Sequence, residues 1–233
     1  MIRNILFDAD DTLLDFQRSE REALSRTLRE FGAEPTPGLL RRYHEINASF
    51  WKLLELKQIE REDLKRKRYE QLIEEYHLPL SAQAVAERYE KLLGEQYFLI
   101  DGARSLLETL SPNYRLYIVS NGGLNVQLNR IRHAGIGAYF SDVFISQEVG
   151  YDKPDAEFFN VCFSRIPNFS REETVIVGDS LSSDIAGGKN AGIKTVWYHP
   201  NGPSSRTDIF PDCEIHHLSE FPAALERLNT LIR

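Results

Sequence analysis

From residue 103 onward, short runs of β-branched and aliphatic residues alternate with amphipathic helical segments. The candidate strands are residues 116–119, 143–145, 174–177 and 195–198. The candidate helices are residues 103–110, 124–133, 156–166 and 185–191. Because parallel strands need a long crossover connection, usually a helix, this repeat predicts parallel strands covered by helices. We therefore predict an α/β fold with a doubly wound parallel sheet.

The N-terminal part of the chain adds one strand and then changes in character. Residues 2–7 form a short apolar run broken by acidic residues, which is typical of a buried strand that ends in a loop. Residues 17–96 are rich in Glu, Arg, Leu, Lys and Tyr, and their apolar residues recur three and four positions apart, as in amphipathic helices. Three prolines divide this stretch into about four helices. We predict a helical domain, residues 17–96, inserted in a core formed by residues 1–16 and 97–233.

Length and charge exclude several classes of protein. At about 150 residues per domain, a chain of 233 residues suits one domain with an insertion. Its 28 basic and 35 acidic side chains give a formal net charge of −7, which repels the phosphate backbone of nucleic acids. The basic run at residues 65–68 is flanked by acidic residues at spacings that allow pairing along a helix, so we interpret it as a solvated helix face. We expect no nucleic-acid partner.

The cysteines and the apolar segments bear on where the protein works. Cys162 and Cys213 are too few for a disulfide framework or a four-cysteine zinc site, which favours a reducing compartment. No apolar segment of signal-peptide length precedes the first acidic residue, and no run of about 18 apolar residues follows. We therefore predict a cytoplasmic protein without a membrane anchor. The sequence gives no prediction of the oligomeric state.

Polar residues directly follow several of the predicted strands. Open parallel sheets bind ligands outside the carboxyl ends of their strands, where such residues meet. The residues that we expect to converge there are Asp8, Asp10, Thr12, Ser120, Asn121, Lys153, Asp179 and Asp184. Taken alone, each motif is typical of a plain helix cap, turn or loop. Their occurrence together, at the ends of predicted strands, favours a functional site.

Carboxylates that converge in this way need a cation. Asp8, Asp10 and Asp179, with Asp184 close by, would repel one another strongly in a partly dry site. A set of oxygen ligands with neither Cys nor His suits Mg²⁺ together with water and a phosphate oxygen. We therefore predict Mg²⁺ as the cofactor and a phosphate group in the substrate.

The same residues supply the chemistry of phosphoryl transfer. Asp8 should be ionised at neutral pH and could attack phosphorus directly. Asp10, two residues further along an extended segment, would reach the leaving-group oxygen and act first as an acid and then as a base. Lys153 offers a cation, and Ser120 a hydroxyl, to the charge that spreads over the phosphoryl oxygens.

Four motifs make the chain resemble the haloacid dehalogenase-like hydrolase superfamily. They are Asp8-x-Asp10-x-Thr12, Ser120-Asn121-Gly122, Lys153-Pro154 and Gly178-Asp179-x-x-x-x-Asp184. The resemblance covers the whole chain and implies a Rossmann-like core with an inserted α-helical cap domain that closes over the substrate. Within the superfamily, residues 8–16 look most like the opening of the bacterial pyrimidine 5'-nucleotidase-like branch.

The resemblance also implies a role for each site residue. Asp8 would be the nucleophile that forms an aspartyl-phosphate, Asp10 the general acid and base, and Lys153 the cation that neutralises nucleophile and phosphate. The phosphate-binding residues would be Ser120, Asn121 through its amide, and Thr12 through its support of the first loop. The Mg²⁺ ligands would be Asp8, the Asp10 carbonyl, Asp179 and Asp184, the last directly or through water.

The predicted activity is hydrolysis of a small phosphomonoester, and the family branch favours nucleoside 5'-monophosphates. A phosphatase of sugar phosphates or phosphoglycolate, or a phosphosugar mutase, would share all four motifs and stays an alternative. A haloacid dehalogenase would need neither the acid at Asp10 nor a metal site. A catalytically idle binding module would not need the complete set of catalytic side chains.

Substrate specificity would depend on side chains of the helical insertion. Phe50, Trp51, Tyr69 and Tyr97 could stack on a base, whereas aromatic residues on amphipathic helices more often pack in a core. The sequence alone does not identify the substrate.

Overall fold

The computed structural model describes residues 1–200, 202 and 208–230. Its centre is a six-stranded sheet in which every neighbouring pair is parallel, with the order β3-β2-β1-β4-β5-β6. The strands are β1 (Asn4–Phe7), β2 (Arg115–Ser120), β3 (Asp142–Ile145), β4 (Thr174–Gly178), β5 (Lys194–Tyr198) and β6 (Cys213–Ile215). This topology confirms the predicted doubly wound, Rossmann-like sheet.

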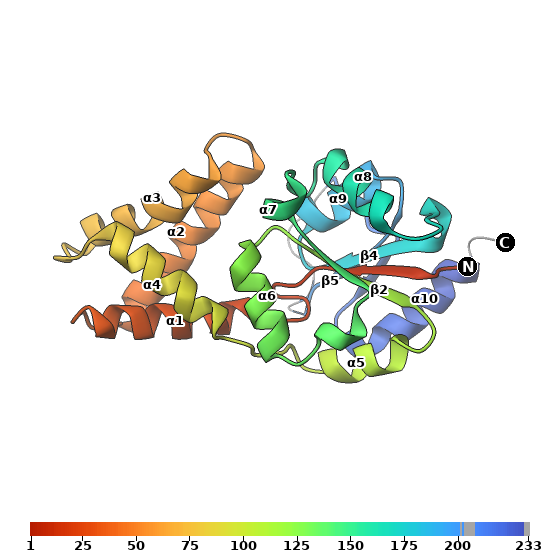
Figure 1. Ribbon diagram of the computed structural model, residues 1–233, viewed down its shortest axis with the longest axis horizontal. Helices are drawn as coiled ribbons and strands as arrows, with labels where there is room; N and C mark the ends of the chain where they lie inside the picture. The colour runs from red at the N-terminus through yellow and green to blue at the C-terminus, as the bar shows by residue number, and fades with distance from the viewer. Residues whose placement is uncertain (201, 203–207, 231–233) are drawn as a thin grey trace.

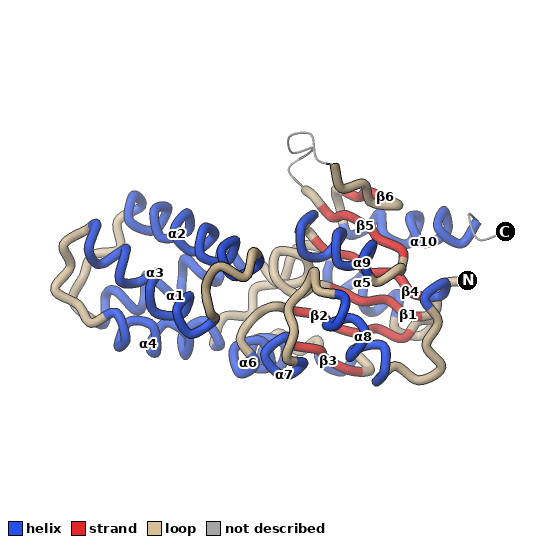
Figure 2. Tube along the Cα trace, turned by 90° about the horizontal axis from the view of Figure 1, so that it is seen from above, coloured by secondary structure: helices blue, strands red, loops and turns tan. Residues whose placement is uncertain are grey.

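Helices cover both faces of the sheet (Figures 1 and 2). On one face lie α5 (Ala103–Leu110), α6 (Leu124–His133) and α10 (Phe221–Thr230). On the other face lie α7 (Ser146–Val149), α8 (Ala156–Arg165) and α9 (Ala186–Asn190). None of the described helices is both long enough and apolar enough to cross a bilayer.

β1 lies at the centre of the sheet, between β2 and β4. Ile5 and Phe7 pack into one hydrophobic core, and Leu6 packs into the core on the opposite face. This alternation follows from the two-residue period of a strand. Because both faces are covered, the strand is a continuous apolar run, and the first residue with a charged side chain after it, Asp8, stands at the carboxyl edge.

Helices α1–α4 lie beyond the carboxyl ends of the strands (Figure 1). They are α1 (Phe16–Glu30), α2 (Pro37–Glu55), α3 (Arg61–Glu75) and α4 (Ala82–Gly94), and we call them the cap. The cap has its own hydrophobic core, in which the rings of Tyr43, Tyr69 and Tyr89 pack together. The predicted helical insertion is therefore present, while its division from the core at residues 16/17 and 96/97 stays a prediction.

Two short segments join the cap to the core, and they run antiparallel to each other. The amide of Asp15 donates to the carbonyl of Phe98 at 2.9 Å, and the amide of Ile100 donates to the carbonyl of Leu13 at 2.9 Å. Asp15 also caps α1, because its carboxylate accepts a hydrogen bond from the amide of Arg18 at 2.8 Å. The chain therefore leaves the core and returns to it at one place.

Candidate active site

A pocket at the carboxyl ends of β1, β2 and β4 collects the residues that the motifs single out. Its lining from the core includes Asp8, Asp10, Ser120, Asn121, Lys153, Asp179 and Asp184. Its lining from α2 of the cap includes Trp51, Lys52 and Glu55. Thr12 does not line the pocket and is fully buried. The fold thus brings the core residues together from four separate segments of the chain.

Lys153 is the centre of the charged network in this pocket. Its ammonium nitrogen lies 2.6 Å from Oδ1 of Asp8, 2.6 Å from Oδ1 of Asp184 and 2.9 Å from the carbonyl oxygen of Val119. Its side chain is only 1% exposed. Burial opposes the charge on Lys153, but the carboxylates of Asp184 and Asp8 outweigh burial and raise the pKa of the ammonium group. Lys153 is therefore a fixed cation beside Asp8.

The Asp8 carboxyl is also strongly perturbed. Burial raises its pKa to about 7, against the lowering effect of Lys153 and with a further rise from Asp184 and Asp10. Burial and the charge of Asp8 likewise raise the pKa of Asp179 well above its usual range. One ammonium group therefore does not compensate the carboxylates gathered here.

Three of these carboxylates form a group that could hold a metal ion. Asp8, Asp179 and Asp184 can each direct one ligand oxygen so that the three oxygens lie within 4.8 Å of one another. Hard oxygen donors without sulfur or imidazole suit Mg²⁺, and a divalent cation would offset the excess negative charge. The donor set therefore fits the predicted cofactor. The carboxylate of Asp10 does not belong to this group.

Thr12 and Asp184 form hydrogen bonds that hold the Asp8 carboxylate and the loop after β4 in place. The hydroxyl of Thr12 donates to Oδ2 of Asp8 at 3.1 Å and accepts a hydrogen bond from the amide of Asp179 at 3.1 Å. The carboxylate of Asp184 accepts a hydrogen bond from the amide of Ser180 at 3.1 Å. A Cβ at Gly178 would lie 2.6 Å from Cβ of Asp184, so the close approach at this position requires glycine. The geometry of Thr12 favours the supporting part of its predicted role.

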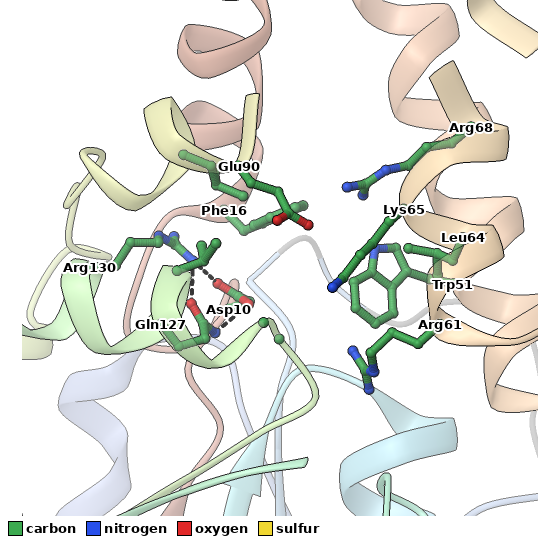
Figure 3. Close-up of a pocket in the computed structure, with 14 residues that line it drawn as sticks. Asp10, Phe16, Trp51, Arg61, Leu64, Lys65, Arg68, Glu90, Gln127 and Arg130 are labelled. Atoms are coloured by element: carbon green, nitrogen blue, oxygen red, sulfur yellow. Dashed lines mark hydrogen bonds and ion pairs between the residues drawn. The ribbon is translucent and has the colours of Figure 1, made fainter. Parts of the chain in front are cut away.

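Asp10 faces a second set of partners on α6 (Figure 3). Oδ2 of Asp10 accepts a hydrogen bond from Nε2 of Gln127 at 2.8 Å, and Oδ1 forms an ion pair with Arg130. Nε2 of Gln127 also lies 2.7 Å from the hydroxyl oxygen of Ser120. Arg130 is completely buried and reaches the hydroxyl of Ser19 on α1 at 3.3 Å. Arg130 and Gln127 therefore set the orientation of the Asp10 carboxylate.

Asn121 uses its side chain to hold the loop that carries Lys153. Its Nδ2 donates to the carbonyl of Lys153 at 2.8 Å, and its Oδ1 accepts from the amide of Lys153 at 2.8 Å. The hydroxyl oxygen of Ser120 accepts a hydrogen bond from the amide of Gly122 at 3.1 Å. The predicted contacts of Ser120 and of the Asn121 amide with phosphate stay predictions.

The sequence did not identify Arg61, Gln127 or Arg130 as site residues. Arg61, at the start of α3, donates to the carbonyl of Asn121 and to the hydroxyl of Ser146, each at 2.9 Å, and so links the cap to the core. Nothing in the local sequence distinguishes Arg61 from other surface arginines. Gln127 and Arg130 could have been recognised, because they lie three residues apart and therefore share one face of the helix that follows the second motif.

A family model described as haloacid dehalogenase-like hydrolase matches residues 2–192. This match covers most of the chain and includes all the pocket residues of the core. The chain belongs to the haloacid dehalogenase-like hydrolase family. The expectation from the four motifs is thereby confirmed, and the protein is a hydrolase.

Relatives of this hydrolase match over nearly its whole length. The HAD-hydrolase YfnB of Bacillus subtilis is 38% identical over 98% of this chain and 97% of its own. The pyrimidine 5'-nucleotidase PynA of Streptococcus pneumoniae is 36% identical over 96% of this chain and 94% of its own. The pyrimidine 5'-nucleotidase YjjG of Escherichia coli is 29% identical over 95% and 96%. These relatives agree with the bacterial nucleotidase-like branch expected from residues 8–16.

A solved structure of YfnB is similar to nearly the whole of this hydrolase. It superposes with a TM-score of 0.92 and covers 96% of this chain and 98% of its own. That structure is described as bound to magnesium and as revealing interdomain movement. Core and cap helices together therefore have counterparts in a relative of known structure.

Proposed function

We propose that this hydrolase is a Mg²⁺-dependent phosphatase that acts on small phosphomonoesters through an aspartyl-phosphate at Asp8. The observation that carries the proposal is that Asp8 lies beside the ammonium group of Lys153 and in one group of carboxylates with Asp179 and Asp184. A nucleophile, a fixed cation and a set of hard metal ligands in one pocket are the parts that phosphoryl transfer needs. Bound Mg²⁺ would supply positive charge for the phosphate oxygens and would be held by Asp8, the Asp10 carbonyl, Asp179 and Asp184.

In the first step, an oxygen of Asp8 attacks phosphorus, and the bond from phosphorus to the leaving oxygen breaks. Asp10 donates a proton to that oxygen, so the alcohol leaves neutral and the phosphoryl group stays on Asp8. Lys153, Ser120 and the Asn121 amide face the charge on the phosphoryl oxygens.

In the second step, water attacks phosphorus and the bond to the Asp8 oxygen breaks. Asp10, now ionised, accepts a proton from the water, which releases inorganic phosphate and regenerates the Asp8 carboxylate. Arg130 and Gln127 support both steps, because they hold the carboxylate that moves the proton.

Nucleoside 5'-monophosphates, with pyrimidine nucleotides first, are the proposed substrates. PynA and YjjG, which match nearly the whole chain, are named pyrimidine 5'-nucleotidases. Asp10, Asp179 and Asp184 favour phosphoryl transfer over dehalogenation, since halide leaves without a proton and the dehalogenase reaction needs no metal.

The experiment compares kcat/KM for uridine 5'-monophosphate, glucose 6-phosphate and phosphoglycolate, with Mg²⁺ and with EDTA. We expect hydrolysis only with Mg²⁺ and the highest value for the nucleotide. In Asp8→Asn, turnover should vanish, whereas Asp142→Asn at an exposed position should behave as the wild type. A tenfold advantage of a sugar phosphate or phosphoglycolate would refute the nucleotidase assignment, and activity in Asp8→Asn would refute the aspartyl-phosphate.

A further inference from the structure

A second cavity adjoins the pocket of Asp8 and lies between α3 and α4 of the cap and α6 of the core (Figure 3). Asp10, Phe16, Trp51 and Gly122 line both the cavity and the pocket. Part of the cavity is open to solvent. Because Asp10 is the proposed proton donor to the leaving oxygen, the cavity lies on the side where the leaving group would extend.

Two aromatic rings line this cavity. Of the four aromatic residues considered for stacking on a base, Trp51 lines it. Phe50 packs against the cap core, Tyr69 is fully buried in that core, and Tyr97 is 55% exposed outside both pockets. The second ring is Phe16, at the first residue of α1. Flat aromatic walls suit a planar, apolar-faced ligand.

Arg68 supplies hydrogen-bond donors at the cap end of the cavity. Its residue is 5% exposed, and NH1 donates to Oδ1 of Asn47 at 2.7 Å. Nε has no hydrogen-bond partner among the described residues. The predicted solvated helix face at residues 65–68 is therefore wrong for Arg68, although Lys65, Arg66 and Lys67 do form ion pairs along α3. Because Nε is buried, a ligand in the cavity would be bound by the terminal nitrogens of the guanidinium instead.

Glu90 on α4 faces Arg68 across the same cavity (Figure 3). Its carboxylate makes no hydrogen bond or ion pair with any residue in the described part of the chain. The cavity wall thus offers a donor group and an acceptor group that point toward each other, with aromatic rings beside them. A ligand between them would need an acceptor on the side of Arg68 and a donor on the side of Glu90.

We propose that this cavity binds the nucleobase of a nucleoside 5'-monophosphate, and we call Phe16, Trp51, Arg68 and Glu90 the base subsite. Phe16 and Trp51 flank the ring, Arg68 donates to a carbonyl or ring nitrogen of the base, and Glu90 accepts from an N–H. A sugar phosphate has no aromatic face, and the carboxylate of phosphoglycolate would be repelled by Glu90. The inference rests on the proposed phosphatase activity and identifies the part of the substrate that the cap reads.

The test uses two substrates that differ by the base alone, uridine 5'-monophosphate and ribose 5-phosphate, with the full-length protein and Mg²⁺. The readout is the ratio of kcat/KM for the nucleotide to kcat/KM for the sugar phosphate. We expect a ratio above ten in the wild type and a fall of about tenfold to a hundredfold in Arg68→Met, because hydrogen bonds to a charged group are lost. Arg66 is exposed and lies two residues before Arg68 on the same helix, so Arg66→Met should keep the wild-type ratio.

Because Arg68 is buried among tyrosines, Glu90→Gln provides a second variant that keeps the shape of the side chain. It should lower the same ratio about tenfold, since the amide is a weaker acceptor than the carboxylate. A wild-type ratio near one, or an unchanged ratio in both variants, would overturn the base subsite. Hydrolysis of ribose 5-phosphate in the same assay would still support the phosphatase activity. If the wild type hydrolysed neither substrate, the proposed function itself would fail.

Discussion

The ammonium nitrogen of Lys153 lies 2.6 Å from Oδ1 of Asp8, and both side chains are almost completely buried. The same nitrogen also contacts Asp184, so one cation serves two carboxylates. Asp179 makes no ion pair through its side chain within the described residues. The charge balance at this edge of the sheet is therefore incomplete in the protein alone.

Replacement of Lys153 by methionine should impair both folding and activity. The change would leave Asp8 and Asp184 buried without a cation, and loss of one partner of a buried pair costs about 3–5 kcal/mol. Urea unfolding of metal-free protein at pH 8 measures this loss. Lys189→Met, at an exposed ion pair with Asp212, should change the free energy of unfolding by less than about 1 kcal/mol. A similar small change in Lys153→Met would contradict the central role of this ammonium group.

The thermal stability of the metal-free protein should depend on Asp8 and on pH. The pKa of Asp8 is raised to about 7 in the folded protein, chiefly by burial, so the folded state binds its proton more tightly than the unfolded state. The resulting stabilisation is present below the unfolded pKa near 3.8 and is lost as pH rises through about 7. The Tm of metal-free Asp8→Asn, measured relative to the wild type, should therefore increase from pH 5 to pH 8.

Addition of Mg²⁺ gives the matching control for this pH dependence. The ion should raise the Tm of the wild type more at pH 8 than at pH 5, because ionised carboxylates bind it. An equal increase at both pH values, or none, would show that the three carboxylates are not its ligands.

Gly178→Ala should weaken metal binding without removing a ligand. A new Cβ would lie 2.6 Å from Cβ of Asp184 and closer still to its carboxylate, so that side chain must shift. We expect a fall of about 10–100-fold in Mg²⁺ affinity, as for other changes next to metal ligands. Titration of activity against Mg²⁺ concentration measures the change. Gly38→Ala in the cap, where the nearest atom lies 4.0 Å from the new Cβ, should leave the affinity unchanged.

Arg130→Met should reduce stability and slow catalysis. The guanidinium is fully buried and is the ion-pair partner of Asp10, and it also donates to Oε1 of Gln127 at 3.0 Å. We expect a loss of about 3 kcal/mol in the free energy of unfolding and a lower kcat, because the Asp10 carboxylate is no longer oriented. Arg132→Met, on an exposed part of the same helix, should stay within about 0.5 kcal/mol of the wild type. Wild-type kcat in Arg130→Met would contradict the positioning role.

The sheet and the positions of its loop residues were predictable because they depend on local patterns. Asp8 follows a buried run and Asp179 follows another, and parallel topology brings such ends to one edge. Arg68 was harder to interpret, since three neighbouring basic residues are solvated. A signal existed even so: Leu64 and Leu72 lie four residues before and after Arg68 on the buried stripe of α3, which turns Arg68 inward.

The contacts between cap and core were not predictable from local patterns. Arg61 reaches a carbonyl on a loop that is 60 residues further along the chain, and only the packing of α3 over that loop brings them together. On the cap side, Arg130 donates to the hydroxyl of Ser19 and to the carbonyl of Gln96. A different orientation of the cap helices would place both groups elsewhere. Such contacts are set by the relative position of two domains, which no periodicity in the sequence encodes.

The cap is joined to the core by two segments that hydrogen-bond to each other at Asp15 and Phe98. A chain that passed from one to the other through a tight turn would keep every strand and the whole row of carboxylates, because none of the sheet is threaded through the cap. The core with its row of carboxylates and the cap can thus be inherited separately. A shared core combined with different caps would then give enzymes that catalyse one reaction on many substrates.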